Sequence, residues 1–331
     1  MKKYLYIVLL VGVCFGNQRF SRTPIDVLQL DTSNLRTNNF RNEEELLNFI
    51  QSTMEANFIP GLSISIAKGG SIVWNKHFGY ANINENILVD ENTMEYCYPK
   101  FIPNLQTNTS IEVIEIEAGE IHKNIETCVG VWNAITELGG DRKSLLITLG
   151  GGVITDLGGF VASTYKRGID FVNIPTTLLS MVDASVGGKT GVDLGVLKNQ
   201  IGLFSNPEMV IVDTAYLATV TEREMKSGMA EIIKYGITYD IALFNEIKKN
   251  LNVNDLIFRS IEIKNEVVLE DPKENSLRKI LNFGHTVGHA IESFYLESED
   301  KENLTHGEAI AIGMVCESYI SNQLLNFPVE K

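Results

Sequence analysis

A triple-glycine turn most constrains how this chain can fold. The run 144–149, SLLITL, is short and rich in β-branched and leucine residues, as expected of a buried parallel strand. The segment 150–160, GGGVITDLGGF, follows it directly and can begin a helix. This order exposes backbone N–H groups at a helix N-terminus, where an anion can approach without meeting a Cβ. The stretch predicts an anion-binding turn in an α/β domain, but its spacing is not G-x-G-x-x-G, so a purely structural turn stays open.

Length and charge restrict the architecture and the partners. With 331 residues the chain can hold two domains, and its net charge is -14. Such an acidic chain repels phosphate backbones, so nucleic acid and anionic membrane surfaces are not expected partners. The four cysteines, at positions 14, 97, 128 and 316, form no C-x-x-C pair. We therefore expect neither a disulfide framework nor a thiolate zinc site, and the reducing cytoplasm is the default location.

The first residues conflict with that location. Lys2 and Lys3 precede an apolar run over 4–15, which makes residues 1–16 similar to a secretory signal peptide. The run is too short to span a bilayer. Residues 1–16 are therefore predicted to be a signal-like segment.

The next part of the chain predicts a helix followed by a hairpin. Helical spacing covers 43–56, and two alternating strands cover 61–82. Residues 43–93 resemble the start of the serine β-lactamase and penicillin-binding-protein-like hydrolases. We expect residues 17–87 to be a fragment of that kind without an active site.

Two residues match the hydrolase active site in spacing, but not in predicted structure. Ser65 and Lys68 have the spacing of the serine and lysine that those hydrolases place on one helical turn. Here both fall in a predicted strand, where residues three apart point to opposite faces. The match is therefore interpreted as accidental.

Nine motifs in a fixed order characterise the chain from about residue 88. They are VDENT (89–93), AGEIHK (118–123), GGGVITDLGGF (150–160), YKRG (165–168), IPTTLLSMVDASVGGKTGVD (174–193), KNQIG (198–202), SGMAEIIKYG (227–236), LNFGHTVGHAIE (281–292) and HGEA (306–309). Together they resemble 3-dehydroquinate synthase over about 240 residues. That family has a further strand and helix before VDENT and further helices after position 331. We therefore expect that two unrelated sequences are joined near VDENT and that the synthase-like part is truncated at both ends.

The resemblance implies the fold. We expect an α/β nucleotide-binding domain with a mainly parallel sheet over 88–213, followed by an α-helical metal-binding domain over 214–331. Helical spacing over 222–235, 242–249 and 255–269 supports the second assignment. The active site should lie between these two halves, where such sites usually form.

A histidine cluster suggests a metal site. His285 and His289 lie four residues apart, on one face if the segment is helical, so the pair could chelate an ion. Glu231 and His306 bring the candidates to four for three ligand positions. The resemblance assigns Glu231, His285 and His306 to the metal and His289 to the substrate. Two nitrogens and one carboxylate suit Zn²⁺ or Co²⁺ and leave positions open for substrate hydroxyls.

The resemblance also implies the cofactor and substrate contacts. Residues around NAD would be Asp90, Asn92, Glu120, Lys123, Gly151, Gly152, Val153, Asp156, Thr176, Thr177, Asp183, Lys189, Lys198, Tyr216 and Thr219. Substrate contacts would be Arg167, Lys189, Asn199, Lys234, Lys264, Arg278, Asn282 and His289. So many basic residues in an acidic protein suit a strongly anionic ligand. In the family the arginine at position 167 reaches across a dimer interface, so a homodimer is expected.

The activity implied is that of a phosphate-eliminating carbon–oxygen lyase dependent on NAD and a divalent metal. It converts 3-deoxy-D-arabino-heptulosonate 7-phosphate to 3-dehydroquinate and phosphate, in the shikimate pathway to chorismate and the aromatic amino acids. Three alternatives remain: a metal-dependent polyol dehydrogenase of the glycerol dehydrogenase type, an inactive truncated chimera, and an exported hydrolase-like binding protein. NAD and the heptulosonate phosphate are not available outside the cytosol, so we assign the enzyme to the cytoplasm and regard the signal-like segment as foreign to it.

Overall fold

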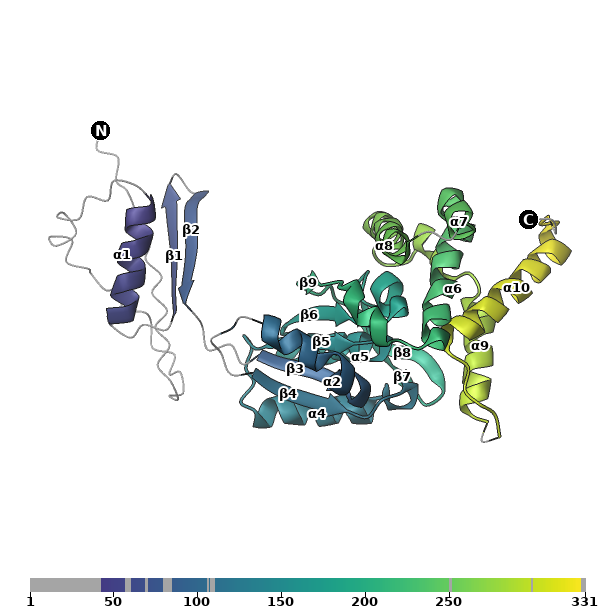
Figure 1. Cartoon of the computed structure of the whole chain (residues 1–331), viewed down its shortest axis with the longest axis horizontal. Coiled ribbons are helices and arrows are strands. Elements are labelled where there is room, and N and C mark those ends of the chain that lie inside the picture. The colour runs from purple at the N-terminus through teal and green to yellow at the C-terminus, as the bar shows by residue number, and fades with distance from the viewer. Residues whose placement is uncertain are drawn as a thin grey trace. The chain divides into compact units, whose positions relative to one another are not determined.

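The chain divides into two units, residues 1–83 and 84–331. The computed structural model describes residues 43–56, 61–68, 71–79, 85–105, 107, 111–249, 252–298 and 300–328 (Figure 1). The predicted signal-like segment 1–16 lies outside the described residues.

The first unit contains the predicted helix and hairpin. Helix α1 spans Glu43–Ala56, and strands β1 (Gly61–Lys68) and β2 (Ser71–Gly79) pair antiparallel. Ser65 and Lys68 both lie on β1, so they do not share the helical turn that the hydrolase pair requires. The resemblance of this unit to those hydrolases stays a prediction.

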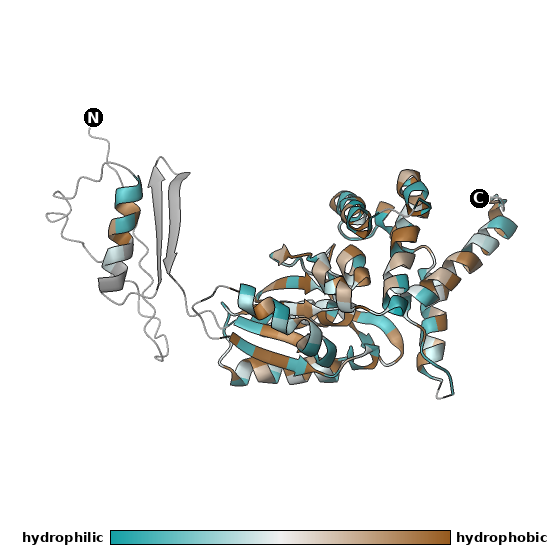
Figure 2. Cartoon of the chain, in the orientation of Figure 1, coloured by the Kyte–Doolittle hydropathy of each residue, from teal (hydrophilic) through white to brown (hydrophobic). Residues whose placement is uncertain are grey.

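The described part of the second unit is built on a five-stranded parallel sheet with the order β4-β3-β5-β6-β9. Its strands are β3 (Glu85–Asp90), β4 (Ile111–Ile116), β5 (Leu145–Gly150), β6 (Asp170–Pro175) and β9 (Met209–Val210). The two central strands β3 and β5 are buried over nearly their whole length, as expected of apolar runs covered on both faces. Figure 2 shows hydrophobic residues along the strands of this sheet. The predicted parallel α/β fold is confirmed.

The boundary between the units lies earlier than predicted. The sequence placed it at 87/88, whereas the structure places it at 83/84. Strand β3 begins at Glu85 and pairs with both β4 and β5. Ile87 is completely buried in this sheet, so residues 85–87 belong to the nucleotide-binding part.

Two hydrophobic layers enclose the sheet. One layer includes Cys128 and Val131 from α4 (Ile125–Glu137) and Leu157 from α5 (Gly152–Thr164). The other layer packs the opposite face against the helices that follow, through residues such as Ile232 and Ile263. The helical half is therefore joined to the sheet by a continuous core.

Short elements connect the sheet to its surroundings. They are α2 (Glu91–Tyr96), α3 (Tyr98–Phe101), η1 (Ile102–Asn104), η2 (Glu120–His122), η3 (Tyr165–Arg167), the π-helical turn η4 (Ser180–Ala184) and η5 (Thr214–Thr219). Strands β7 (Lys189–Leu194) and β8 (Leu197–Phe204) form an antiparallel hairpin outside the main sheet.

The remainder of the second unit is helical, as predicted. Its elements are α6 (Glu222–Thr238), α7 (Ile241–Ile247), α8 (Val253–Glu270), η6 (Leu277–Asn282), α9 (His285–Leu296) and α10 (His306–Leu325). Helices α6 and α8 cover the predicted segments 222–235 and 255–269, whereas α7 ends at Ile247, two residues before the end of the predicted segment 242–249. Among the described residues, none of the helices combines the length and the apolar character needed to cross a bilayer.

Candidate active site

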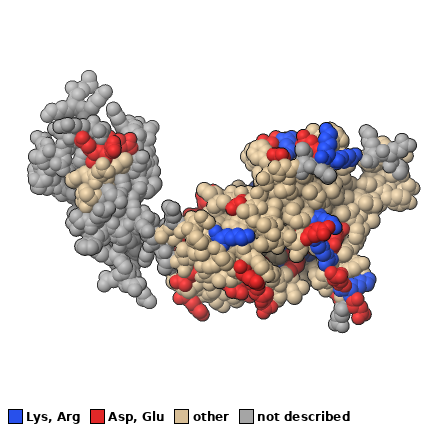
Figure 3. Space-filling model, in the orientation of Figure 1, with Lys and Arg blue, Asp and Glu red and all other residues tan. Residues whose placement is uncertain are grey.

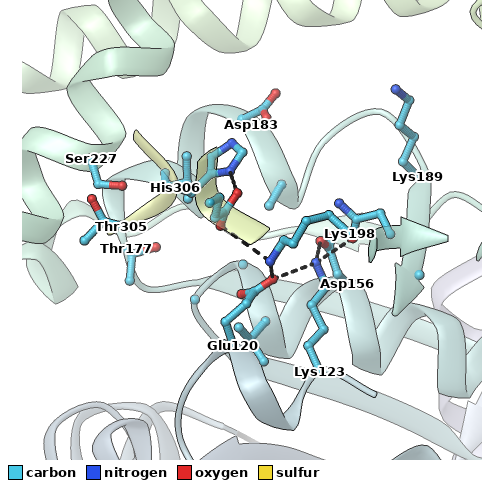
Figure 4. A pocket seen from close by; sticks show the side chains of 18 of the residues that line it. Glu120, Lys123, Asp156, Thr177, Asp183, Lys189, Lys198, Ser227, Thr305 and His306 are labelled. Atoms are coloured by element: carbon cyan, nitrogen blue, oxygen red, sulfur yellow. Dashed lines mark hydrogen bonds and ion pairs between the residues drawn. The ribbon is translucent and has the colours of Figure 1, made fainter. Parts of the chain in front are cut away.

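A cleft of about 1400 Å³ opens between the α/β half and the helical half of the second unit. Its lining includes the N-terminus of α5, the β7–β8 hairpin and the histidine-bearing ends of α9 and α10. Figure 4 shows side chains from both halves pointing into the same space. The site predicted between the halves is therefore present as a cavity.

Most of the predicted site residues line this cleft. They are Asp90, Asn92, Glu120, Lys123, Gly151, Gly152, Val153, Asp156, Thr176, Thr177, Asp183, Lys189, Lys198, Asn199, Thr219, Lys234, Lys264, Arg278, Asn282, His285, His289 and His306. These positions come from segments far apart in the sequence, so their convergence is a result of the fold.

Three predicted residues lie elsewhere. Tyr216 is 5% exposed and packs in the hydrophobic core, so its position does not support the predicted contact with NAD. Arg167 is exposed on η3, and its expected role across a dimer interface stays a prediction. Glu231 is fully buried behind the histidines and contacts them directly.

The triple-glycine turn has the geometry of an anion site. Gly151 is extended and precedes α5, which begins at Gly152, and both line the cleft. A Cβ at Gly150 would lie 2.5 Å from the side chain of Ile154, so only glycine fits there. The free N–H groups at the start of this 13-residue helix favour negative charge.

Glu231, His285 and His306 form a site suited to one metal ion. Oε1 of Glu231 lies 3.8 Å from Nε2 of His285 and 3.6 Å from Nε2 of His306. This oxygen is buried without a hydrogen bond, whereas Oε2 accepts from Lys234. An unpaired buried carboxylate oxygen facing two imidazole nitrogens is the donor set of a divalent cation. The ligand atoms of His285, His289 and His306 also lie within 4.8 Å of one another.

Contacts at the opposite ring nitrogens orient His285 and His306. Nδ1 of His285 lies 3.3 Å from the Phe283 carbonyl oxygen, and Nδ1 of His306 lies 3.4 Å from Oε2 of Glu292. Burial and the nearby Lys234 lower the pKa of His285 to about 3, so this ring is neutral, as a metal ligand must be. Burial also disfavours charge on His306, but the nearby carboxylates of Glu231 and Glu292 outweigh this and raise its pKa to about 10, so a metal ion bound at this ring would displace a proton.

Glycines allow the close packing of α6, α9 and α10, the helices that carry Glu231, His285 and His306. A Cβ at Gly307 of α10 would clash with the backbone of Ser227 on α6. A Cβ at Gly313 would clash with the carbonyl oxygen of Gly284, which precedes α9. Close approach of α10 to both neighbours is thus possible only without side chains at these positions, and it places His306 beside Glu231 and His285.

A buried charged network lies on the side of the cleft where the cofactor is predicted to bind, called the cofactor side below (Figure 4). Nζ of Lys123 donates to Asp156 at 2.6 Å and to Asn199 at 2.7 Å. Lys198 contacts Glu120 and lies 3.2 Å from Asp193. Burial opposes the charge on Lys123, but Asp156 and Glu120 outweigh it and hold the pKa of Lys123 above its usual range. These carboxylates are placed where they could also accept from ribose hydroxyls.

Cationic and amide side chains gather at the other end of the cleft. Lys264 contacts the carboxylate of Asp183, and Lys189 contacts Glu274. The guanidinium of Arg278 is 2% exposed and donates to two backbone carbonyl oxygens, those of Pro272 and Gly187. By contrast, Lys and Arg on the face shown in Figure 3 are scattered among Asp and Glu. The cations named at this end of the cleft each have a carboxylate or carbonyl oxygen as partner.

The sequence analysis missed three acidic residues of the site. Glu274 accepts from Asn282 at 2.5 Å, and Asp193 accepts from the backbone N–H of Asn199 at 2.7 Å. Glu292 contacts both His306 and Lys198. Its position offered a signal, because it lies seven residues after His285 on the same helical face as that histidine.

Comparison with known proteins identifies the family. Two family models match in sequence, "3-dehydroquinate synthase N-terminal" over residues 113–227 and "3-dehydroquinate synthase C-terminal" over 228–331. A 3-dehydroquinate synthase from Parabacteroides distasonis is 42% identical over 252 residues, which cover 74% of this chain and 70% of that protein. The enzyme of the same name from Helicobacter pylori is 49% identical over 207 residues, covering 62% of this chain and 59% of that protein.

Solved structures agree with this result. The 2-epi-5-epi-valiolone synthase ValA from Streptomyces hygroscopicus, with NAD⁺ and Zn²⁺ bound, matches with a TM-score of 0.65 at 28% identity, over 75% of this chain and 76% of that one. A 2-deoxy-scyllo-inosose synthase complexed with carbaglucose-6-phosphate, NAD⁺ and Co²⁺ matches with a TM-score of 0.66 at 27% identity, over 75% and 71% of the two chains. On its sequence and its fold, this chain belongs to the 3-dehydroquinate synthase family.

Proposed function

We propose that this chain is a 3-dehydroquinate synthase of the shikimate pathway. It would convert 3-deoxy-D-arabino-heptulosonate 7-phosphate to 3-dehydroquinate and phosphate. The observation that carries the proposal is the unpaired Oε1 of Glu231, which faces two histidine nitrogens in the cleft that also contains the triple-glycine turn. The curated relatives that share 42% to 49% identity bear this enzyme name.

The cofactors would be NAD and one divalent metal ion, Zn²⁺ or Co²⁺. The N-terminus of α5 would hold the pyrophosphate, and Glu231, His285 and His306 would hold the metal. When bound, NAD would take a hydride from C5 of the substrate and return it, while the metal would act as a Lewis acid toward the substrate hydroxyls. The related synthases with NAD⁺ and Zn²⁺ or Co²⁺ bound support this assignment.

The residues at the cationic end would bind the two anionic groups of the substrate. Lys264 and Arg278 are buried cations facing the cleft, so their charge is little screened by solvent. Burial and the neighbouring His306 lower the pKa of His289 to about 4, so its neutral ring can hydrogen-bond to the substrate. Together with Lys189 and Asn199, these side chains would orient the substrate phosphate, which can accept the C6 proton in its own elimination.

A homodimer in the cytoplasm completes the proposal. Arg167 is exposed and does not line the cleft of its own chain, which suits a side chain that contacts a second copy. The cytoplasm is the compartment in which NAD and the heptulosonate phosphate are available.

The direct test is phosphate release by the full chain. With heptulosonate phosphate, NAD and Zn²⁺, we expect phosphate to appear without net accumulation of NADH. Treatment with a chelator should abolish release, and Zn²⁺ or Co²⁺ should restore it. Net NADH formation from glycerol would instead identify a polyol dehydrogenase, and a folded, metal-loaded chain that releases no phosphate would contradict the proposal.

A further inference from the structure

Glu292 connects the metal site to the cofactor side of the cleft. Its side chain is 5% exposed and lies on α9, one turn beyond His289. Oε2 of Glu292 lies 3.4 Å from Nδ1 of His306, and Oε1 lies 3.5 Å from Nζ of Lys198. A buried carboxylate with one oxygen on a ligand histidine and the other on a lysine is well placed to fix the orientation of both.

We propose that Glu292 is the positioning residue for His306. It would hold the proton on Nδ1 and turn Nε2 toward Oε1 of Glu231, which lies 3.6 Å away. This inference rests on the proposed metal site, because it concerns how one ligand of that site is presented.

The two ligand histidines are oriented in different ways. His285 has a backbone carbonyl oxygen, that of Phe283, at its Nδ1, and its position at the start of α9 fixes its backbone. His306 has a carboxylate at the equivalent nitrogen. A carboxylate at Nδ1 makes the ring a stronger electron donor at Nε2, and loss of such a partner usually weakens metal binding 10–100-fold. The dependence on a side-chain partner is therefore specific to His306.

Lys198 restrains the carboxylate from the opposite side. Its ammonium also contacts Glu120 and lies 3.2 Å from Asp193, and its side chain is 4% exposed. With three acidic partners around it, this lysine cannot move toward solvent without leaving buried charges unpaired. Glu292 is thus fixed at one oxygen by the cofactor-side network, which lets the other oxygen define the His306 ring.

Metal affinity of the full chain tests this role. Co²⁺ would be titrated into metal-free protein in competition with a chelator, and its visible absorption bands would report the ligand geometry. We expect Glu292→Ala to weaken Co²⁺ binding about 10–100-fold and to change the bands. Glu292→Gln keeps an acceptor oxygen of the same reach, so it should recover part of the loss. Glu297→Gln removes an exposed carboxylate near the end of the same helix and should bind Co²⁺ like the wild type.

The outcomes separate this inference from the proposed function. Wild-type protein that fails to bind Co²⁺ would overturn the metal site and the inference with it. The role of Glu292 alone would be overturned if the wild type binds Co²⁺ and both Glu292→Ala and Glu292→Gln bind it with the wild-type affinity and the wild-type spectrum. If Glu292→Ala does not fold, as judged by circular dichroism, the comparison of Glu292→Gln with Glu297→Gln decides the question.

Discussion

Nε2 of His306, at the start of α10, lies 3.6 Å from Oε1 of Glu231 in the middle of α6. The two helices carry the atoms to this separation because glycine replaces a side chain where α10 crosses its neighbours. This carboxylate oxygen is buried and has no hydrogen-bond partner. The proposed metal site therefore depends on helix packing, and substitutions that disturb either the packing or the proposed ligands should both weaken metal binding.

Loss of one ligand should empty the metal site. His285→Ala removes one of the two nitrogens beside Oε1 of Glu231, leaving too few donors for a stable protein site. We expect purified wild-type chain to contain about one metal ion and the variant to contain almost none, as measured by mass spectrometry of the metal. His122→Ala, a histidine that pairs with Glu117, serves as the control and should retain its metal. Equal metal content in all three proteins would contradict the assignment.

Gly313→Ala should weaken metal binding without touching a ligand. The new Cβ would clash with the carbonyl oxygen of Gly284 and push α10 away from α9. Overpacking of this kind typically costs about 1–3 kcal/mol in the free energy of unfolding. Urea unfolding and Co²⁺ titration would measure the two effects.

Gly130→Ala provides the matched control for that prediction. Gly130 lies on α4 with no atom within 4 Å of an added Cβ. Alanine in an exposed helix is favoured over glycine by about 0.5–1 kcal/mol, so this variant should be slightly more stable and bind metal normally. Identical behaviour of the two alanine variants would show that close helix packing does not set the ligand geometry.

Lys123→Met should destabilise the folded chain by about 3 kcal/mol, because it leaves the carboxylate of Asp156 without its buried cation. Adding Asp156→Asn should recover much of this loss, since the unpaired charge is then removed. Lys143→Met, at an exposed position, should change the free energy of unfolding by no more than about 0.5 kcal/mol. Chemical unfolding of the wild type, the two single lysine variants and the double variant would measure these free energies. A double variant less stable than Lys123→Met would contradict the prediction.

Lys264→Met should lower kcat/KM for the heptulosonate phosphate about tenfold or more, because a charged hydrogen bond contributes about 1.5–3 kcal/mol. Lys264 is buried and faces the cleft, and methionine preserves the packing of its methylene stem but leaves Asp183 without this cation, so circular dichroism should first establish that the variant is folded. Lys279→Met removes an exposed cation outside the cleft lining and should leave kcat/KM unchanged. Steady-state phosphate release distinguishes the two, and equal losses would indicate a general effect of net charge.

Much of the fold followed from local patterns in the sequence. The apolar run before Gly150 is the buried strand β5, and the helical spacing after residue 222 marks α6 to α8. The boundary at 87/88 was misplaced because the VDENT motif begins inside β3. Where a strand begins depends on its partners β4 and β5, which lie later in the chain.

The site was predicted by the resemblance more than by spacing. Residue patterns alone left four candidates for three ligand positions, and the structure shows Oε1 of Glu231 facing both His285 and His306. Tyr216 matched a family position but packs in the core. Glu274 was missed because its partner Lys189 lies on another element, and such long-range charge pairing leaves little trace in a single sequence. The position of Glu292 on the same helical face as His285 offered a signal, but its contact with His306 on α10 did not.

The most direct test of the account is the number of phosphates released per NAD. Full-length chain with bound Zn²⁺ would be given excess heptulosonate phosphate and a small, known amount of NAD, and phosphate and absorbance at 340 nm would be recorded together. Because the hydride is returned in each cycle, we predict many phosphates per NAD and no lasting rise in absorbance. Release that stops at one phosphate per NAD, with equivalent NADH left in solution, would contradict the proposed reaction.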